Sequence, residues 1–222
     1  MSEIQKSQPK PFKKRRYYIP EEVEEHNKAV DCWVSFSNEV YNISSLIQAN
    51  QGKPECQSLI KAAGADITHW FNSKTGDPRT FIDPETNLES VFCPWGPYLH
   101  INSSVPGSTA PGLPWWKDKE KYFIGRLTKK TRKIRIINTL TREEETITVA
   151  SEETLNEILD RMLNLNTHAG SYTWKRLGRP LDMELTLDEN GIPDESNEFL
   201  KFNLDDEFYI PAIHIYYNDD LT

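Results

Sequence analysis

Histidine and cysteine are the residue types that most often ligate metals or act as nucleophiles, and this 222-residue chain has few of either. The three cysteines and five histidines are Cys32, Cys56, Cys93, His26, His69, His100, His168 and His214. No CxxC pair occurs and the histidines are scattered, so we predict neither a zinc site nor a disulfide framework, and expect buried free thiols. No Ser/His/Asp set, phosphate-binding loop or paired-carboxylate motif stands out. We therefore predict that the protein is not an enzyme.

Charge is strongly segregated along the chain, although the net charge is only −8. Residues 1–16 carry +5 and residues 117–135 carry +7, whereas residues 17–116 and 136–222 carry −7 and −13. The acidic majority would repel a phosphate backbone, so we expect no nucleic-acid partner. The basic stretches are predicted to dock on an acidic partner through Lys13, Lys14, Arg15, Arg16, Lys129, Lys130 and Arg132. For the second stretch, a solvated entry to a strand is the alternative interpretation.

The mean hydropathy of −0.66 points away from a membrane protein. The chain has no uninterrupted apolar run of about 18 residues, and its first residues lack the apolar core of a secretory signal. We expect a cytoplasmic protein with no membrane partner.

The elements that would position any site differ between the two halves of the chain. Residues 1–16 hold six basic groups and little apolar area, so they are expected to form a disordered tail. Pro20 and the acidic residues after it favour a short helix, and residues 32–43 predict a hairpin that turns at Ser37 and Asn38. Two helical patches follow within residues 44–63, interrupted at residues 50–54. From residue 72 onward, Gly, Pro and Asp predict an irregular connector with a few aromatic anchors.

The second half has clearer periodicity. Alternating residues predict paired strands over 133–140 and 145–149, and two further strands over 171–177 and 212–217. Between them we predict an amphipathic helix capped by Ser151, whose apolar stripe comprises Leu155, Ile158, Leu159, Met162 and Leu163. The whole chain is thus predicted to be an α+β protein.

Residues 17–71 resemble the cytochrome b5-like haem-binding fold. The resemblance rests on residues 31–36 (DCWVSF), 40–46 (VYNISSL) and 63–68 (AGADIT), which are similar to the family signatures D-x-W-V, V-Y-D-V-T-x-F and A-G-x-D-A-T in the same order. It implies a b5-like domain over residues 17–85, followed by a connector over residues 86–120.

That family holds haem between two histidines, one in an H-P-G-G loop and one roughly two dozen residues later. Here the first loop reads Asn50-Gln51-Gly52-Lys53, and the second position falls near residues 73–75, which read Ser-Lys-Thr. We therefore expect no bound cofactor. His69 stands close to the implied pocket and has two interpretations, an axial ligand of haem iron or a packing histidine, of which we favour the second.

Residues 121–222 are assigned to a ubiquitin-like β-grasp domain, which the order strand, strand, helix, strand resembles. Residues 174–181 (WKRLGRPL) are similar to that family's short strand and glycine turn. The chain ends in Asp220-Leu221-Thr222 rather than Gly-Gly, so the resemblance implies an interaction module and not a conjugated modifier.

A degenerate b5-like domain followed by a β-grasp domain is similar to a family of ciliary proteins. The resemblance implies a non-enzymatic adaptor in the cytoskeleton of the motile ciliary axoneme, with radial spoke proteins as partners. A haem-dependent redox or electron-transfer protein of the cilium is the alternative.

Overall fold

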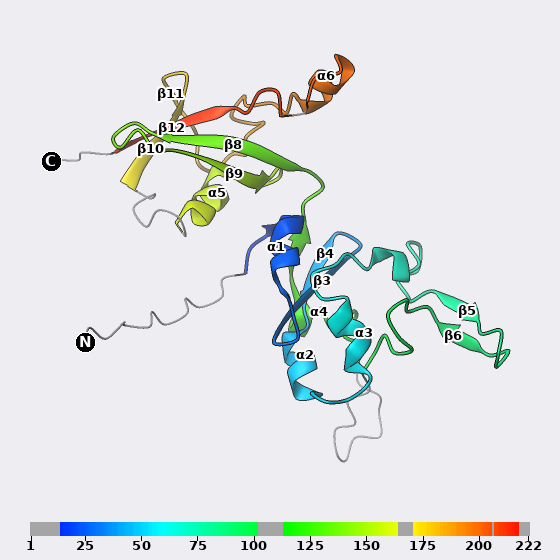
Figure 1. Ribbon diagram of the computed structural model, residues 1–222. Coiled ribbons are helices and arrows are strands. Elements are labelled where there is room, and N and C mark those ends of the chain that lie inside the picture. The colour runs from blue at the N-terminus through cyan, green and yellow to red at the C-terminus, as the bar shows by residue number, and fades with distance from the viewer. Residues whose placement is uncertain (1–13, 102–112, 164–170, 206, 218–222) are drawn as a thin grey trace, which may run out of the picture.

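The computed structural model describes residues 14–101, 113–163, 171–205 and 207–217. The described chain forms two units, each built on a five-stranded sheet, and a two-stranded hairpin that projects from the first unit (Figure 1). The predicted α+β class is confirmed. The expected tail over residues 1–16 lies outside the described residues up to Lys13.

The first sheet has the strand order β1-β7-β4-β3-β2. Its strands are β1 (Tyr17–Tyr18), β2 (Asn27–Lys28), β3 (Asp31–Phe36), β4 (Glu39–Asn42) and β7 (Phe123–Leu127). The predicted hairpin is confirmed as β3–β4. Its two turn residues, Ser37 and Asn38, both adopt the left-handed backbone conformation that two-residue hairpins favour, with φ of 51° and 61°.

Short helices surround this sheet, and the first three lie at the predicted places. They are α1 (Pro20–Glu25), α2 (Ser44–Ala49), α3 (Cys56–Lys61), the 3₁₀ helix η1 (Thr68–Trp70) and α4 (Lys119–Tyr122). Pro20 occupies the first turn of α1, where its missing N–H costs no hydrogen bond. The break between α2 and α3 is also as predicted. The apolar faces of α2 and α3 join the sheet in one buried core.

The boundary predicted at residue 121 is wrong, because β7 belongs to the first sheet. β7 pairs antiparallel with β4 and parallel with β1, so the first unit closes only at residue 127. A five-residue strand has the same local pattern whichever sheet it joins. Its long-range partners, and not its own sequence, decide where it lies.

Part of the stretch predicted to be a connector is structured. It contains strand β6 (Glu89–Val91), which pairs with β5 (Thr80–Ile82) just before it. It also supplies four residues to the core of the first unit: Leu99, Ile101, Trp115 and Trp116. The aromatic anchors that we expected are therefore part of that core, and the interpretation of residues 86–120 as a linker is wrong.

The second unit has the strand order β11-β10-β12-β8-β9, with β8 and β12 parallel at its centre. The strands are β8 (Thr131–Asn138), β9 (Glu144–Ala150), β10 (Tyr172–Arg176), β11 (Arg179–Pro180) and β12 (Ala212–Tyr217). Helix α5 (Leu155–Met162) packs its predicted apolar stripe on this sheet. Its cap is Thr154 and not Ser151, because the Thr154 hydroxyl accepts from the Glu157 amide while the Glu157 carboxylate accepts from the Thr154 amide. Helix α6 (Ser196–Lys201) was not predicted.

Gly125 allows β1 to lie against β7. A Cβ built on Gly125 would stand 2.5 Å from the Tyr18 ring and 2.6 Å from the Arg15 carbonyl oxygen. We expect Gly125→Ala to lower the free energy of unfolding by about 1–3 kcal/mol, because backbone on one side cannot move away. Urea unfolding of the full chain measures this. Arg126→Ala, at the exposed next position, is the control, and equal stability of both variants would contradict the packing argument.

Candidate functional site

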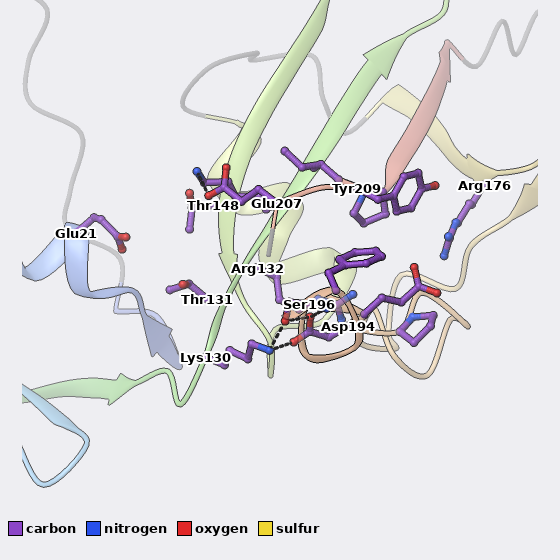
Figure 2. A pocket seen from close by; sticks show the side chains of 16 residues that line it. Glu21, Lys130, Thr131, Arg132, Thr148, Arg176, Asp194, Ser196, Glu207 and Tyr209 are labelled. Carbon is purple, nitrogen blue, oxygen red and sulfur yellow. Dashed lines mark hydrogen bonds and ion pairs between the residues drawn. The ribbon is translucent and has the colours of Figure 1, made fainter. Parts of the chain in front are cut away.

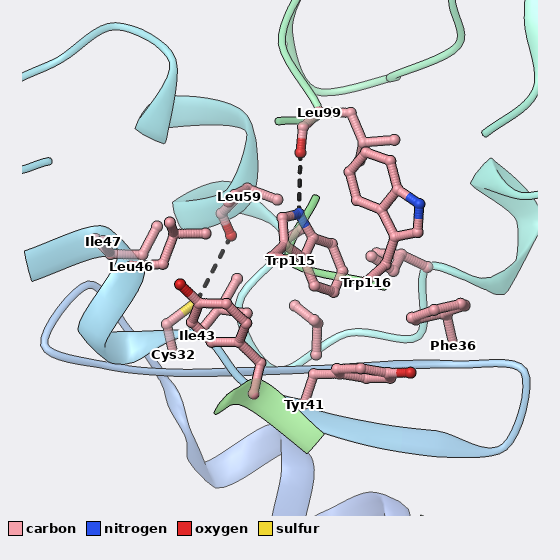
Figure 3. Close-up of a cluster of buried hydrophobic side chains, with 14 of the residues drawn as sticks. Cys32, Phe36, Tyr41, Ile43, Leu46, Ile47, Leu59, Leu99, Trp115 and Trp116 are labelled. Atoms are coloured by element: carbon pink, nitrogen blue, oxygen red, sulfur yellow. Dashed lines mark hydrogen bonds between the residues drawn. The ribbon is translucent and has the colours of Figure 1, made fainter. Parts of the chain in front are cut away.

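Two tryptophans share the core of the helices that flank the loop carrying the first haem ligand in the resembled family. Trp115 and Trp116 share one buried cluster with the inward side chains of α2 and α3, which flank that loop (Figure 3). Trp115 packs edge-on against Phe36 and Tyr41, with ring centroids 5.9 Å and 5.7 Å away. Its indole N–H donates to the Leu99 carbonyl at 3.1 Å, so the ring is fixed by a hydrogen bond as well as by packing.

The position of the first family ligand is occupied by Asn50, whose side chain closes helix α2. Its amide nitrogen donates to the Leu46 carbonyl at 3.0 Å, and its amide oxygen accepts from the Lys53 ammonium at 2.8 Å. The Asn50 carbonyl also accepts from the Cys56 thiol. These bonds satisfy the end of the helix internally, so Asn50 has a structural role in the loop.

The position of the second family ligand, residues 73–75, lies in an exposed turn. His69, on the neighbouring 3₁₀ helix, is exposed, and its Nε2 accepts a hydrogen bond from the Trp70 indole at 2.8 Å. The lone pair that would bind iron is therefore already used. The packing interpretation of His69 stays a prediction, and the axial-ligand alternative would require this hydrogen bond to break.

The residues at this site do not fit a haem held in the manner of the family. Neither family position offers a ligating side chain, and Trp115 and Trp116 pack in the same core as side chains of α2 and α3. A cavity beside the loop, lined in part by Ile47, Cys56 and Ile60, has a volume of only about 120 Å³. This is small against the 300–1,000 Å³ or so of ordinary ligand pockets. In the part of the chain that the structure describes, no cluster of three or more His, Cys, Asp or Glu side chains is arranged to hold a metal.

A buried ion pair joins the two units. Glu153, at the start of the segment leading into α5, has a side chain only 1 % exposed, and its carboxylate accepts from the Arg161 guanidinium at 2.8–2.9 Å. Burial raises the pKa of Glu153, while the hydrogen bonds and charge of Arg161 oppose that rise. Arg161 reaches across to the first unit, where it contacts Glu22 of α1 at 2.5 Å. One guanidinium thus bridges two carboxylates from different units.

Further polar contacts extend this seam, by which we mean the contact between α1, α5 and the loop from β7 to β8. Arg15 also pairs with Glu22, and Arg16 lies near Glu157 of α5. Glu152 accepts hydrogen bonds from the Thr128 hydroxyl and the Lys129 amide, which fixes the short passage from β7 to β8. The chain crosses between the sheets in only three residues. The relative position of the two units is therefore set by covalent and ionic contacts together.

Most of the side chains predicted to dock a partner make contacts within the chain. Lys130 pairs with Asp194 and donates to the Ser196 hydroxyl at 2.6 Å, at the wall of a groove of about 250 Å³ (Figure 2). Arg132 is buried, and donates to Asp188 at 2.8 Å and to the Ile192 carbonyl at 2.7 Å.

Arg132 is buried, and Arg15 is partly buried in its pair with Glu22, so both guanidinium groups already have partners within the chain. Docking through these two residues stays a prediction. Arg16 also contributes to the seam. Lys14 and Lys129 are exposed and stay predicted docking residues, whereas Lys13 lies outside the described part.

Comparisons with known proteins agree with the cytochrome b5 resemblance. The family model of the cytochrome b5-like haem/steroid-binding domain matches residues 19–128. This range reaches through the inserted tryptophans and ends one residue after β7. A Xenopus tropicalis protein named cytochrome b5 domain-containing protein 1 is 50 % identical over 93 % of this chain and 96 % of its own length. The mouse and human proteins of the same name are each 46 % identical over 94 % of this chain and 92 % of their own.

The chain belongs to the family of cytochrome b5 domain-containing protein 1. Members of that family thus align with both units here, whereas mouse cytochrome b5 reductase 4 aligns over only 23 % of the chain, at 42 % identity. Among solved structures, the ubl5 domain from the polyubiquitin locus of T. thermophila covers 42 % of this chain at 14 % identity, with a TM-score of 0.31. A score this low does not establish a shared fold. No helix within the described ranges combines the length and apolarity needed to span a membrane.

Sequence reasoning missed the residues that join the two units. Glu153 and Arg161 look like ordinary charges at and before a helix, and only their burial identifies them as a bridge. The pair Trp115-Trp116 could have been predicted to be buried, because exposing two large apolar rings to water is unfavourable. A search for large apolar residues inside the expected linker would have found them.

We expect that purified full-length protein does not form a stoichiometric low-spin complex with haem. Asn50→His restores the first family ligand and is the matched variant. It too should show no such spectrum, because the second family position, residues 73–75, still offers no ligand to the iron. Titration with haemin followed by the Soret band measures both proteins. A sharp stoichiometric spectrum for the wild type would contradict us, and its loss in His69→Ala would identify the ligand.

The bridge at the seam gives a second prediction. Arg161→Met removes the cation and leaves the Glu153 carboxylate buried and unpaired, which should cost about 3–5 kcal/mol of stability. The double variant Arg161→Met/Glu153→Gln removes both charges and should recover much of the loss. Thermal unfolding compares them with Arg179→Met, an exposed control on β11. If Arg161→Met unfolds at the same temperature as that control, the bridge does not stabilise the protein.

Proposed function

We propose that this protein is a non-enzymatic adaptor of the motile ciliary axoneme, associated with radial spoke proteins. The observation that supports the adaptor role is the change at the expected haem site. Both family ligand positions lack a ligating side chain, and Trp115 and Trp116 belong to the core of this unit. A b5-like unit without room for haem retains its shape and surface and loses its redox chemistry. The proposed location in the axoneme rests on the family resemblance of the sequence.

The seam supports the same proposal. Because Arg161 bridges Glu153 and Glu22, the two units present their surfaces at a fixed relative position. An adaptor that holds two partners benefits from this, since the second contact then needs little further ordering.

We infer that the second unit is a β-grasp interaction module. The topology of this unit supports the inference. Two antiparallel strands lead into a helix, and a late strand, β12, returns parallel to the first strand of the unit at the centre of the sheet. This is the strand order that the sequence resemblance implies.

Haem binding is the second candidate function, favoured by the description of the matching family model. It would require a ligand set other than the two family positions, and Trp115 would have to leave the core. The haemin titration described above decides between the candidates.

Salt extraction from demembranated cilia tests the axonemal role. The tagged wild-type chain should remain with axonemes after detergent treatment and be released with radial spoke proteins. Lys13→Ser/Lys14→Ser/Lys129→Ser removes basic groups without touching the ion pairs of the seam, and should be released at lower salt because screened attraction to an acidic partner is lost.

The matched control is Lys28→Ser/Lys61→Ser/Lys74→Ser, which removes three exposed lysines of the first unit. Absence of the wild-type protein from axonemes would overturn the proposed location. Equal release of both triple variants would show that these basic side chains take no part in docking.

A further inference from the structure

The β5–β6 hairpin is a two-stranded sheet whose large apolar side chains are exposed. Its residues pair as Thr80 with Val91, Phe81 with Ser90 and Ile82 with Glu89. Among the described residues, the two strands pair only with each other. Figure 1 shows the hairpin projecting from the first unit, away from the second. An isolated two-stranded hairpin is marginally stable in water, and usually needs a third strand or a packed face.

The hairpin carries large apolar side chains on both faces. Phe81, Ile82, Leu88 and Val91 are each between 42 % and 66 % exposed. Because directly paired residues share a face and neighbours alternate, Phe81 and Leu88 lie on one face while Ile82 and Val91 lie on the other. A flat partner surface would cover only one of these pairs. A strand added at the edge would extend both faces at once, so its side chains would contact both apolar pairs.

The base of the hairpin is fixed to the core, so its edges are held in a defined place. The Arg79 amide donates to the Trp70 carbonyl at 2.8 Å, and the Phe92 amide donates to the Arg79 carbonyl at 2.7 Å. Phe92 also packs against the core of the first unit. The exposed strands are therefore a positioned template for pairing.

The negative charge of the hairpin favours a partner segment with positive charge. Residues 80–91 contain Asp83, Glu85 and Glu89 but no Lys or Arg. The Glu85 amide donates to the Asp83 carboxylate at 2.9 Å, and such backbone donors lower the pKa of Asp83, which keeps this end of the hairpin anionic. A second copy of the chain would bring three more negative charges to the edge, which is unfavourable. A strand with lysine or arginine beside apolar residues would be attracted.

We propose that the β5–β6 hairpin binds a basic, extended segment of a partner protein by adding it as a third strand. This deepens the adaptor role by assigning one of its contact surfaces. The test uses purified protein and a synthetic peptide, so its outcome does not depend on where the protein resides in the cell. Failure of this proposal and failure of the axonemal proposal are therefore distinguishable.

The probe is a labelled peptide of alternating lysine and valine, titrated with the full chain and followed by fluorescence anisotropy. Two control peptides replace every lysine by glutamate, or alternate valines by proline, which removes the backbone donors a strand needs. We expect binding of the lysine–valine peptide alone. Hydrogen exchange should show new protection of amides within residues 80–91.

Two kinds of variant test the surface without removing its β propensity. Ile82→Thr/Val91→Thr keeps β-branched side chains but removes apolar area, and Glu85→Lys/Glu89→Lys reverses two charges. Each should weaken binding by about tenfold or more. Glu143→Lys/Glu145→Lys, exposed in the second unit, is the charge-matched control and should bind like the wild type.

Three results would overturn the proposal. They are equal binding by all variants, protection confined to residues outside the hairpin, and equal affinity for the proline-containing peptide. Light scattering of the full chain supplies a fourth. A dimer that the threonine variant dissociates would show that a second copy occupies the hairpin instead.

Discussion

A buried carboxylate needs a cation, and in this protein that requirement joins the two units. Glu153 is withdrawn from water, and Arg161 supplies the compensating charge from the last turn of α5. Because the same guanidinium also contacts Glu22, satisfying the charge inside one unit fixes α1 of the other. The three-residue passage from β7 to β8 would by itself allow rotation. The ionic bridge removes that freedom.

The first unit illustrates how the family fold is kept although both family ligand positions have changed. The sheet, the hairpin turn and the helices α2 and α3 follow the family pattern, and the interior between them still has to be filled. Trp115 and Trp116 fill it from a segment outside the recognisable motifs. Asn50 keeps the ligand loop closed through its own hydrogen bonds. Packing and hydrogen bonding at these positions thus replace the contacts that a prosthetic group would make.

Local pattern was sufficient for most elements, and insufficient wherever a partner distant in sequence decides the outcome. The turn at Ser37-Asn38 and the stripe of α5 are properties of short stretches, so the sequence predicts them. The membership of β7 in the first sheet depends on strands about 85 residues or more earlier, and no local pattern records it. The burial of Arg132 has the same cause. In sequence it is one of several basic residues in a row, and its contact with Asp188 appears only in three dimensions.

The pairing of β1 with β7 has a consequence for the order in which the protein is made. These strands are neighbours in the sheet but more than a hundred residues apart in the chain, so the first unit cannot close until residue 127 has left the ribosome. Until then α2 and α3 have no Trp115 to cover them, and their apolar faces are open to chaperones or to misassociation. Synthesis of the second unit begins at β8 immediately afterwards. Closure of the first core and emergence of the second unit are therefore consecutive events during translation.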